Sequence, residues 1–145
     1  MIRKTDFCRE DVLYVASARE KGFSDGWNEN MLNSAVNAGR LFGFIAETDG
    51  ERVGFITFSG GMDGVFDLED VFVEERFRGK GLGKELLTAC LNEAAAHGAV
   101  KMLLEVRKTN VAAISLYKSF GFSPLCERKK YYADGESAAV YIKEF

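Results

Sequence analysis

A glycine-rich segment in the middle of the chain, residues 78–84, carries residue types that suit a phosphate group. It reads Arg-Gly-Lys-Gly-Leu-Gly-Lys and follows an apolar stretch that ends at Val73. Glycine lets a backbone approach a ligand closely, and a helix N-terminus offers unpaired N–H groups and a partial positive charge. A strand, a glycine-rich turn and a helix in succession therefore predict a site for a phosphate-bearing ligand.

Two familiar nucleotide-binding motifs do not match this segment. The dinucleotide fingerprint Gly-x-Gly-x-x-Gly fails because Lys84 stands where a glycine must follow Gly79 and Gly81. The P-loop fails because the position five residues before Gly83 is not glycine, and because Glu85 replaces the Ser or Thr that must follow the lysine. The phosphate-bearing ligand is therefore of another class.

Length and composition narrow the class of protein. The chain has 145 residues, of which 47% are hydrophobic and 28% charged, and this predicts a single globular domain, 1–145, with its own core. A formal net charge of −3 excludes a global basic field for nucleic acid. Cys8, Cys90 and Cys126 are widely spaced, so they favour neither a metal site nor a disulfide framework and indicate a reducing cytoplasm. The sequence predicts no signal peptide and no membrane span.

The elements that must position the glycine-rich segment are strands and helices in alternation. The predicted strands are residues 1–5, 42–48, 52–58, 65–73, 100–106, 124–132 and 138–144. The predicted helices are residues 10–21, a short helix capped by Asn28 and ended by Gly39, residues 81–97, and a helix opened by Asn110 and ended by Gly121, with a turn at 23–27. The order β-α-α-β-β-β-α-β-α-β-β predicts an α/β fold with a mixed sheet and helices on its faces.

Residues 78–83 resemble the Arg/Gln-x-x-Gly-x-Gly/Ala segment of the GCN5-related N-acetyltransferase (GNAT) superfamily. The predicted element order is also that of the family, so the resemblance covers nearly the whole chain. Residues 104–110 (Leu-Glu-Val-Arg-Lys-Thr-Asn) and 113–122 (Ala-Ile-Ser-Leu-Tyr-Lys-Ser-Phe-Gly-Phe) are similar to the bacterial ribosomal-protein-alanine N-acetyltransferases, the RimI type. Residues 128–132 (Arg-Lys-Lys-Tyr-Tyr) match the tail of that group.

The resemblance implies the GNAT fold, acetyl-CoA as co-substrate and a set of site residues. The residues implied to contact acetyl-CoA are Val71, Phe72 and Val73 beside the pantetheine arm and acetyl group, Arg78, Gly79, Lys80, Gly81, Leu82, Gly83 and Lys84 around the pyrophosphate, and Asn110 near the thioester. Glu105 resembles the general base of the family, and Tyr117 resembles its general acid.

These residue types suit acetyl transfer to an amine. An α-amino group has a reference pKa of ~7.7–8.0, so a modest base frees a useful fraction of it near neutrality. We expect Glu105 at a strand end among apolar neighbours, where desolvation would make it a stronger base. The phenol of Tyr117, with a reference pKa of ~10, stays protonated and can donate to sulfur. A strand N–H near residues 71–73 would stabilise the charge on the carbonyl oxygen. No covalent intermediate and no metal is required.

Each assignment also has a purely structural interpretation. The glycine-rich segment fits a tight turn into a helix. Glu105 fits an ion pair with Arg107 or Lys101 on the sheet surface. Tyr117 fits a half-buried packing residue, and Asn110 fits a helix cap, a role that is compatible with a ligand contact.

The acceptor is the least determined part of the hypothesis. The RimI resemblance implies the N-terminal α-amino group of a protein, with a ribosomal protein that begins with alanine as the target. Trp27 and Tyr131 are either core aromatic residues or the walls of a peptide groove. Glu69 and Asp70 are similar to residues of acetyltransferases that act on small amines, so either one could share or replace the role of Glu105. The alternative functions are a small-molecule amine or polyamine acetyltransferase and a non-catalytic acyl-CoA-binding module.

Overall fold

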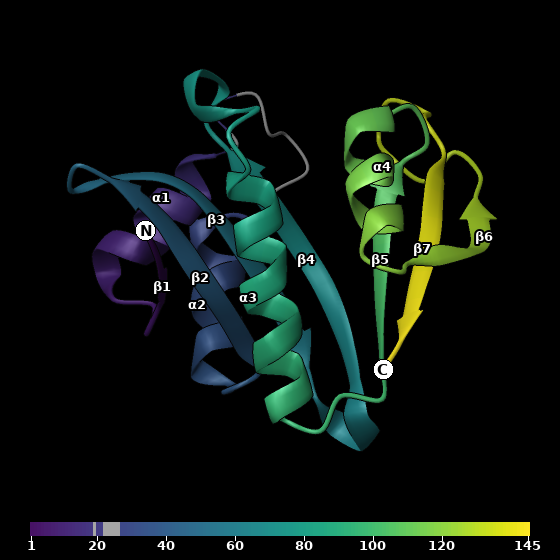
Figure 1. Cartoon of the computed structure of the whole chain (residues 1–145), viewed down its shortest axis with the longest axis horizontal. Coiled ribbons are helices and arrows are strands. Elements are labelled where there is room, and N and C mark those ends of the chain that lie inside the picture. Colours follow the sequence, from purple (N-terminus) through teal and green to yellow (C-terminus); the bar gives the residue numbers. More distant parts are fainter. Residues whose placement is uncertain (19, 22–26) are drawn as a thin grey trace.

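The computed structural model of the protein describes residues 1–18, 20–21 and 27–145. Its strands are β1 (Ile2–Lys4), β2 (Leu41–Thr48), β3 (Glu51–Gly60), β4 (Val65–Val73), β5 (Lys101–Arg107), β6 (Ser123–Arg128) and β7 (Ala138–Glu144). Its helices are α1 (Arg9–Ser17), α2 (Glu29–Asn37), α3 (Leu82–Ala96) and α4 (Val111–Ser119), with short 3-10 helices η1 (Met62–Gly64) and η2 (Glu75–Phe77). The predicted element order and the mixed α/β fold are confirmed (Figure 1).

Two predicted elements are shorter than expected. Helix α1 ends at Ser17, not at residue 21, because the chain turns there with a hydrogen bond from the Ala18 N–H to the Val15 carbonyl (3.2 Å). Strand β6 ends at Arg128, not at residue 132, because the following residues fold into a loop of their own. Of the predicted turn at 23–27, residues 23–26 lie outside the described part of the chain.

The seven strands form a single sheet, in the order β1-β2-β3-β4-β5-β7-β6. Strands β4 and β5 are parallel, and α3 supplies the crossover that such a pair needs. Their ladder runs from Val65 opposite Lys101 to Leu68 opposite Leu104. Beyond this point the two strands diverge, which opens the sheet at its centre (Figure 1).

A β-bulge in β4 lies where this opening begins. Asp70 pairs with Thr57 of β3 and Leu68 pairs with Phe58, so Glu69 is an extra residue between the two pairs. An extra residue reverses which side chains point to which face of a sheet. Accordingly, Leu68 packs in the core beneath α3, whereas Phe72 packs in the core on the opposite face.

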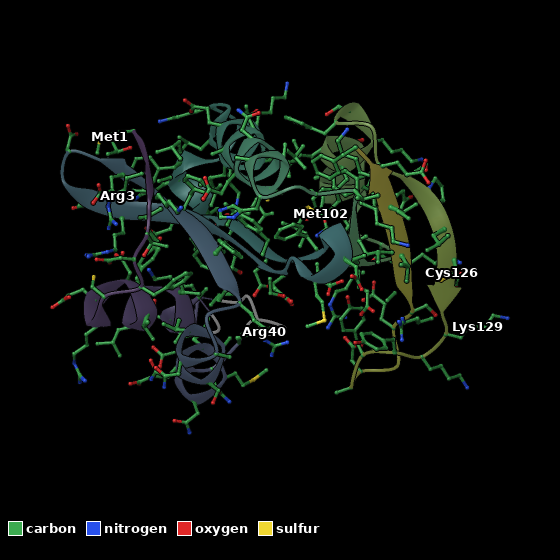
Figure 2. The ribbon with its side chains drawn as sticks, turned by 90° about the horizontal axis from the view of Figure 1, so that it is seen from below. Met1, Arg3, Arg40, Met102, Cys126 and Lys129 are labelled. Atoms are coloured by element: carbon green, nitrogen blue, oxygen red, sulfur yellow. The ribbon has the colours of Figure 1, made fainter. Side chains whose placement is uncertain are left out.

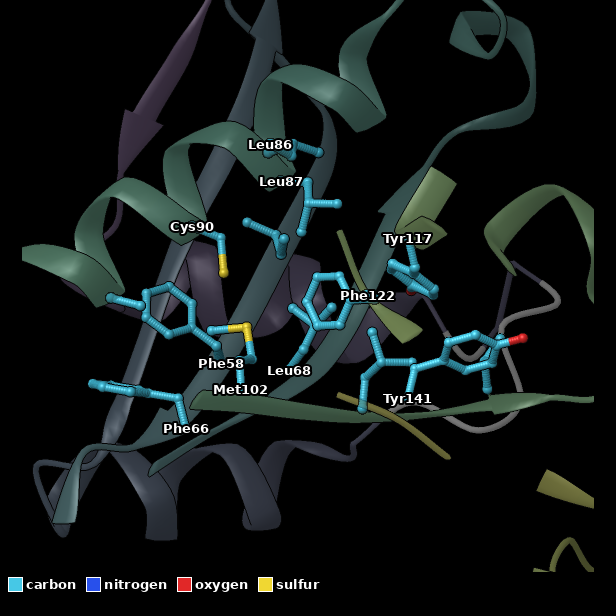
Figure 3. Close-up of a cluster of buried hydrophobic side chains, with 14 of the residues drawn as sticks. Phe58, Phe66, Leu68, Leu86, Leu87, Cys90, Met102, Tyr117, Phe122 and Tyr141 are labelled. Carbon is cyan, nitrogen blue, oxygen red and sulfur yellow. The ribbon is translucent and has the colours of Figure 1, made fainter. Parts of the chain in front are cut away.

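Two hydrophobic cores fix the helices on the two faces of the sheet. On one face, Leu87 and Cys90 of α3 lie over Met102, with the α4 side chain Tyr117 at the end of the same cluster (Figure 3). On the other face α1 and α2 pack against the sheet through a smaller cluster: Val12, Val15, Ala18, Leu32, Leu41, Ile45, Phe55 and Phe72. None of the described helices is long and apolar enough to cross a bilayer.

The two edges of the sheet lie at opposite ends of the molecule. Figure 2 shows Met1 and Arg3, at the β1 edge, far from Cys126 and Lys129, at the β6 edge. The opening between β4 and β5 therefore lies in the interior of the sheet, away from either edge.

Candidate active site

A cavity of about 690 Å³ occupies the opening between β4 and β5. Its walls come from these two strands, from α4, and from the loop of residues 129–137 between β6 and β7, which we call the β6–β7 loop. The residues that the sequence singled out and that this cavity brings together are Trp27, Glu69, Asp70, Val71, Glu105, Asn110, Tyr117 and Tyr131. Candidates from five separate stretches of sequence thus meet in one place.

The other implied cofactor residues lie outside the cavity lining. Phe72 points its side chain into the core beneath α1 and α2. The Val73 carbonyl accepts a hydrogen bond from Nε of Arg78 (2.8 Å), which folds the following turn back onto the end of β4. The segment 78–84 continues from this turn into the N-terminus of α3.

The glycine-rich turn presents open backbone. Gly79 and Gly81 have φ angles of +76° and +86°, which glycine adopts without strain. No atom of the described residues lies within 4 Å of where a Cβ would stand at either glycine. The space above the turn is therefore free for a ligand group, and the exposed cations Arg78, Lys80 and Lys84 flank it.

The N-terminus of α3 differs from those of two other helices. The Asn28 side chain caps α2 by accepting from the Met31 N–H (2.9 Å), and the Asn110 side chain caps α4 by accepting from the Ala113 N–H (3.2 Å). The N-cap of α3 is Gly81, which has no side chain to accept such a bond. The first N–H groups of α3 thus lie beside open space with a partial positive charge, which suits a phosphate.

Tyr117 is the most buried residue of α4. Only 8% of it is exposed, whereas the apolar residues Leu116 and Phe120 near it in sequence are only partly buried. Its ring packs edge-on against Phe122 (5.9 Å between centroids). Burial, and then the nearby charge of Asp70, raise the pKa of Tyr117 well above its usual range. The phenol therefore keeps its proton and can serve as a donor at the cavity wall.

Glu69 is a cavity carboxylate whose pKa is raised by burial. It is partly buried, and Oε1 accepts a hydrogen bond from the Ser59 hydroxyl (2.5 Å). Desolvation raises the pKa of Glu69, the Ser59 hydrogen bond lowers it, and the charges of Asp67 and Glu105 raise it further. Burial is thus the main cause of the raised pKa of Glu69, and Asp67 and Glu105 are the carboxylates that lie near it.

The surroundings of Glu105 differ from those the sequence predicts. The side chain is exposed and pairs with a charged group, although Val140 lies opposite it on β7, so the burial that the predicted desolvation requires is not found there. Its ion-pair partner is Arg128 of β6 (Nε to Oε1, 3.0 Å), not Arg107 or Lys101. Tyr131 also lies near Glu105, whose carboxylate raises the pKa of the Tyr131 hydroxyl. Desolvation of a carboxylate is found at Glu69 instead, because that side chain lies deeper between β3 and β4.

Sequence reasoning missed two partners of the candidates: Ser59 binds Glu69, and Arg128 binds Glu105. It considered Arg107 only as a partner of Glu105, whereas Arg107 binds Asp134 and Glu136 of the β6–β7 loop. The position of Arg107 was recoverable, because side chains two residues apart on a strand share a face and Glu105 is its neighbour in this sense. The other two contacts join separate strands, and no local pattern encodes them.

Comparisons with known proteins agree with this architecture. The family model described as the acetyltransferase (GNAT) family matches residues 10–122, so the chain belongs to this family. Ribosomal protein bS18-alanine N-acetyltransferase of Escherichia coli is 32% identical over 119 residues, which cover 80% of this chain and 78% of that protein. The crystal structure of the ribosomal-protein-S18-alanine N-acetyltransferase from Escherichia coli superposes with a TM-score of 0.86 at 26% identity, covering 99% and 94% of the two chains.

Other matches are less extensive. Several curated relatives are matched over only 27% to 64% of their own length. A structure from Bacillus anthracis that was solved in complex with acetyl coenzyme A is similar over 78% of this chain and 67% of its own, with 25% identity and a TM-score of 0.68. Membership of the family makes the domain an N-acetyltransferase that uses acetyl-CoA.

Proposed function

We propose that this protein transfers the acetyl group of acetyl-CoA to the N-terminal α-amino group of a protein, with a ribosomal protein that begins with alanine as the first candidate. The observation that carries the proposal is the cavity between β4 and β5. Tyr117 and the carboxylates Glu69 and Glu105 line this one space, and the N-terminus of α3, which has no side-chain cap, supports a phosphate site for the donor. The similarity to ribosomal-protein-alanine acetyltransferases supports the choice of acceptor.

The donor would be held mainly by backbone. When bound, acetyl-CoA supplies an acetyl thioester, which is the activated acyl donor of the reaction. Residues 78–84 fit its pyrophosphate, because the two glycines leave open space and the first N–H groups of α3 have no side-chain cap. Residues 71–73 of β4 would flank the acetyl group, where a strand N–H can stabilise charge on the carbonyl oxygen. Asn110, at the cavity wall, would contact the donor while it caps α4.

The acceptor amine would bind between the two facing carboxylates. Glu105 takes its proton, in the role that the family resemblance implies, either directly or through a water molecule. Glu69 acts on the same proton transfer through its charge, because the two groups interact electrostatically.

Tyr117 would complete the transfer. Its hydroxyl lies at the cavity wall and keeps its proton under the influence of burial and of Asp70. It can therefore donate that proton to the sulfur that leaves as a thiolate. This assignment requires no cysteine, which agrees with the deep burial of Cys90 in the core beneath α3.

A second acceptor class has an observation in its favour. Four carboxylates line the cavity, at Asp67, Glu69, Asp70 and Glu105, and this acidic surface also suits a small polyamine. We place this function second, because the similarity to a ribosomal-protein-alanine N-acetyltransferase extends over more of the chain and has the higher TM-score, 0.86 against 0.68 for the streptothricin acetyltransferase structure. We also propose a reducing, cytoplasmic location, since the thiols of Cys8 and Cys126 are exposed and free.

The experiment is a direct comparison of acceptors. Isotope-labelled acetyl-CoA is incubated with the protein and with an alanine-initiated peptide, the same peptide with a blocked N-terminus, or spermidine, and the products are measured by mass spectrometry. We expect label on the free peptide and none on the blocked one. Faster labelling of spermidine would move the proposal to small amines, and acetyl-CoA binding without transfer to any acceptor would reduce the protein to a binding module.

A further inference from the structure

The β6–β7 loop, residues 129–137, folds over the end of β5. Within it, the Tyr132 N–H donates to the Glu136 carbonyl (3.1 Å) and the Gly135 N–H donates to the Tyr132 carbonyl (2.9 Å). One backbone bond ties it to the chain after β5, from the Lys108 N–H to the Ser137 carbonyl (3.0 Å). Most of the loop is exposed, so few apolar contacts are available to fix its position.

Arg107, the last residue of β5, supplies the charged contacts that hold this loop. Its Nη1 lies 2.8 Å from Oδ2 of Asp134 and 2.8 Å from Oε2 of Glu136. Its guanidinium carbon lies 4.2 Å from the centroid of the Tyr132 ring. A planar guanidinium can bind carboxylates and stack on an aromatic ring at the same time, and a lysine ammonium cannot reproduce this combination. Thr109 adds a second tie, because its N–H and hydroxyl both donate to Glu136.

The loop connects Arg107 to the proposed base. The Tyr132 ring, against which Arg107 stacks, packs edge-on against the Tyr131 ring with 5.2 Å between centroids. Tyr131 and Glu105 both line the cavity, and the Glu105 carboxylate raises the pKa of the Tyr131 hydroxyl. Arg128, which pairs with Glu105, also lies over the Tyr131 ring at 5.6 Å. Arg107 thus lies at one end of a row of contacts and Glu105 at the other, although only one residue separates them on β5.

We propose that Arg107 is a positioning residue of the acceptor site: it fixes the β6–β7 loop and thereby sets Tyr131 against Glu105. We expect its effect on the acceptor side, because the contacts described above lead to this loop and none of them involves residues 78–84. This inference rests on the proposed function, in which Glu105 and Tyr131 face the acceptor amine.

The first test is steady-state kinetics of Arg107→Met with an alanine-initiated peptide. We expect the KM for the peptide to rise about tenfold while the KM for acetyl-CoA stays within about twofold, since uniform loss of acceptor binding raises KM first. Arg107→Lys should fall between the wild type and Arg107→Met. The matched control is Lys108→Met, which removes a neighbouring surface cation paired with Glu127 and should leave both constants unchanged. Equal changes in the two KM values would overturn the proposal.

The second test asks whether Arg107 acts through Tyr131. In a double-mutant cycle, Arg107→Met should cost much less acceptor affinity in a Tyr131→Phe background than in the wild type, because the contact it supports is already missing. Fully additive effects would show that Arg107 acts by another route. If Arg107→Met folds poorly, the double variant Asp134→Asn, Glu136→Gln removes the same ion pairs from the loop side. We expect it to raise the KM for the peptide by a similar factor.

A third readout does not depend on activity. Amide hydrogen exchange of residues 129–137 should become faster in Arg107→Met, with exchange of α3 unchanged. Unchanged exchange in the loop would contradict the proposal even if the enzyme acetylates peptides. Faster exchange in a protein that transfers acetyl to no acceptor would instead support the positioning role and count against the proposed function.

Discussion

The donor side and the acceptor side of the cavity are built by different means. On the donor side, the contacts available to a ligand come from backbone: a turn with two glycines at positive φ and the first N–H groups of α3. On the acceptor side they come from side chains on four elements, including Glu69 on β4, Glu105 on β5 and Tyr131 in the β6–β7 loop. A backbone site is local in sequence, whereas the acceptor site exists only after the sheet has formed.

This difference explains what each side can specify. A backbone cradle recognises a phosphate group and stays the same as long as the turn and helix are kept. A site of side chains changes its specificity with single substitutions, because each carboxylate or tyrosine adds its own charge and shape. The donor is therefore fixed by the family, and the acceptor is set by residues particular to this chain.

The largest expected effect is a loss of turnover on removal of the Tyr117 hydroxyl, which would act between the acetyl donor and the acceptor amine. Tyr117→Phe removes the hydroxyl that we assign as proton donor and keeps the ring that packs against Phe122. We expect kcat to fall roughly 10²–10³-fold, in the range typical of a lost general acid, with the KM for acetyl-CoA and the melting temperature nearly unchanged. Wild-type turnover in this variant would remove Tyr117 from the mechanism.

The next effect compares the two facing carboxylates. Glu105→Gln should lower kcat about 100-fold as the loss of the base, and Glu69→Gln about tenfold as the loss of a neighbouring charge. Glutamine keeps the acceptor oxygen for Ser59, so packing around position 69 should survive. Single-turnover rates at saturating acetyl-CoA measure both. If Glu69→Gln loses more than Glu105→Gln, the base lies on β4 and the small-amine hypothesis gains support.

A smaller effect tests the donor side. Gly81→Ala forces a side chain into a left-handed conformation, a strain of ~1–2 kcal/mol, and places a methyl group in the open space above the turn. The KM for acetyl-CoA should rise about tenfold. Gly50→Ala is the matched control, because Gly50 also has a positive φ (+79°) and no neighbour within 4 Å, but lies in the β2–β3 hairpin. It should lose similar stability and keep the wild-type KM; an equal rise in both variants would count against the cradle.

The smallest effect is a shift in pH dependence. The charge of Glu69 assists the proton transfer, so part of the activity is lost as the pH drops through the pKa of Glu69, which desolvation and the charges of Asp67 and Glu105 raise above its ordinary value. Asp67→Asn removes one of those charges and lowers this pKa. The acid limb of the kcat/KM profile should therefore move to lower pH, with activity at the plateau nearly unchanged. A shift to higher pH would contradict the electrostatic account.

Much of the fold was predictable from the sequence, for reasons that particular residues make plain. Strand β4 and strand β7 have the predicted or nearly predicted bounds, because their apolar residues and flanking turns are local signals. The glycine turn before α3 was likewise recognisable from its residues alone. The bulge at Glu69 was not, because it depends on the register between β3 and β4.

For the acceptor side, the sequence predicted which residues take part but not which contacts they make. Glu105 and Tyr117 were named from the family resemblance, and the cavity brings both together. The charged surroundings of Glu105 could not be foreseen, because Arg128 is brought to it by the strand order of the sheet, in which β7 lies between β5 and β6. The short β6 and the loop that follows it depend in the same way on contacts with Arg107.

Calorimetric titration of acetyl-CoA into three proteins tests the division into donor and acceptor sides most directly. The account predicts that Glu105→Gln binds acetyl-CoA with the wild-type Kd although it transfers acetyl slowly, and that Gly81→Ala binds it about tenfold more weakly. Weakened binding in Glu105→Gln, together with unchanged binding in Gly81→Ala, would contradict the claim that backbone at the start of α3 holds the donor while side chains across the cavity handle the acceptor.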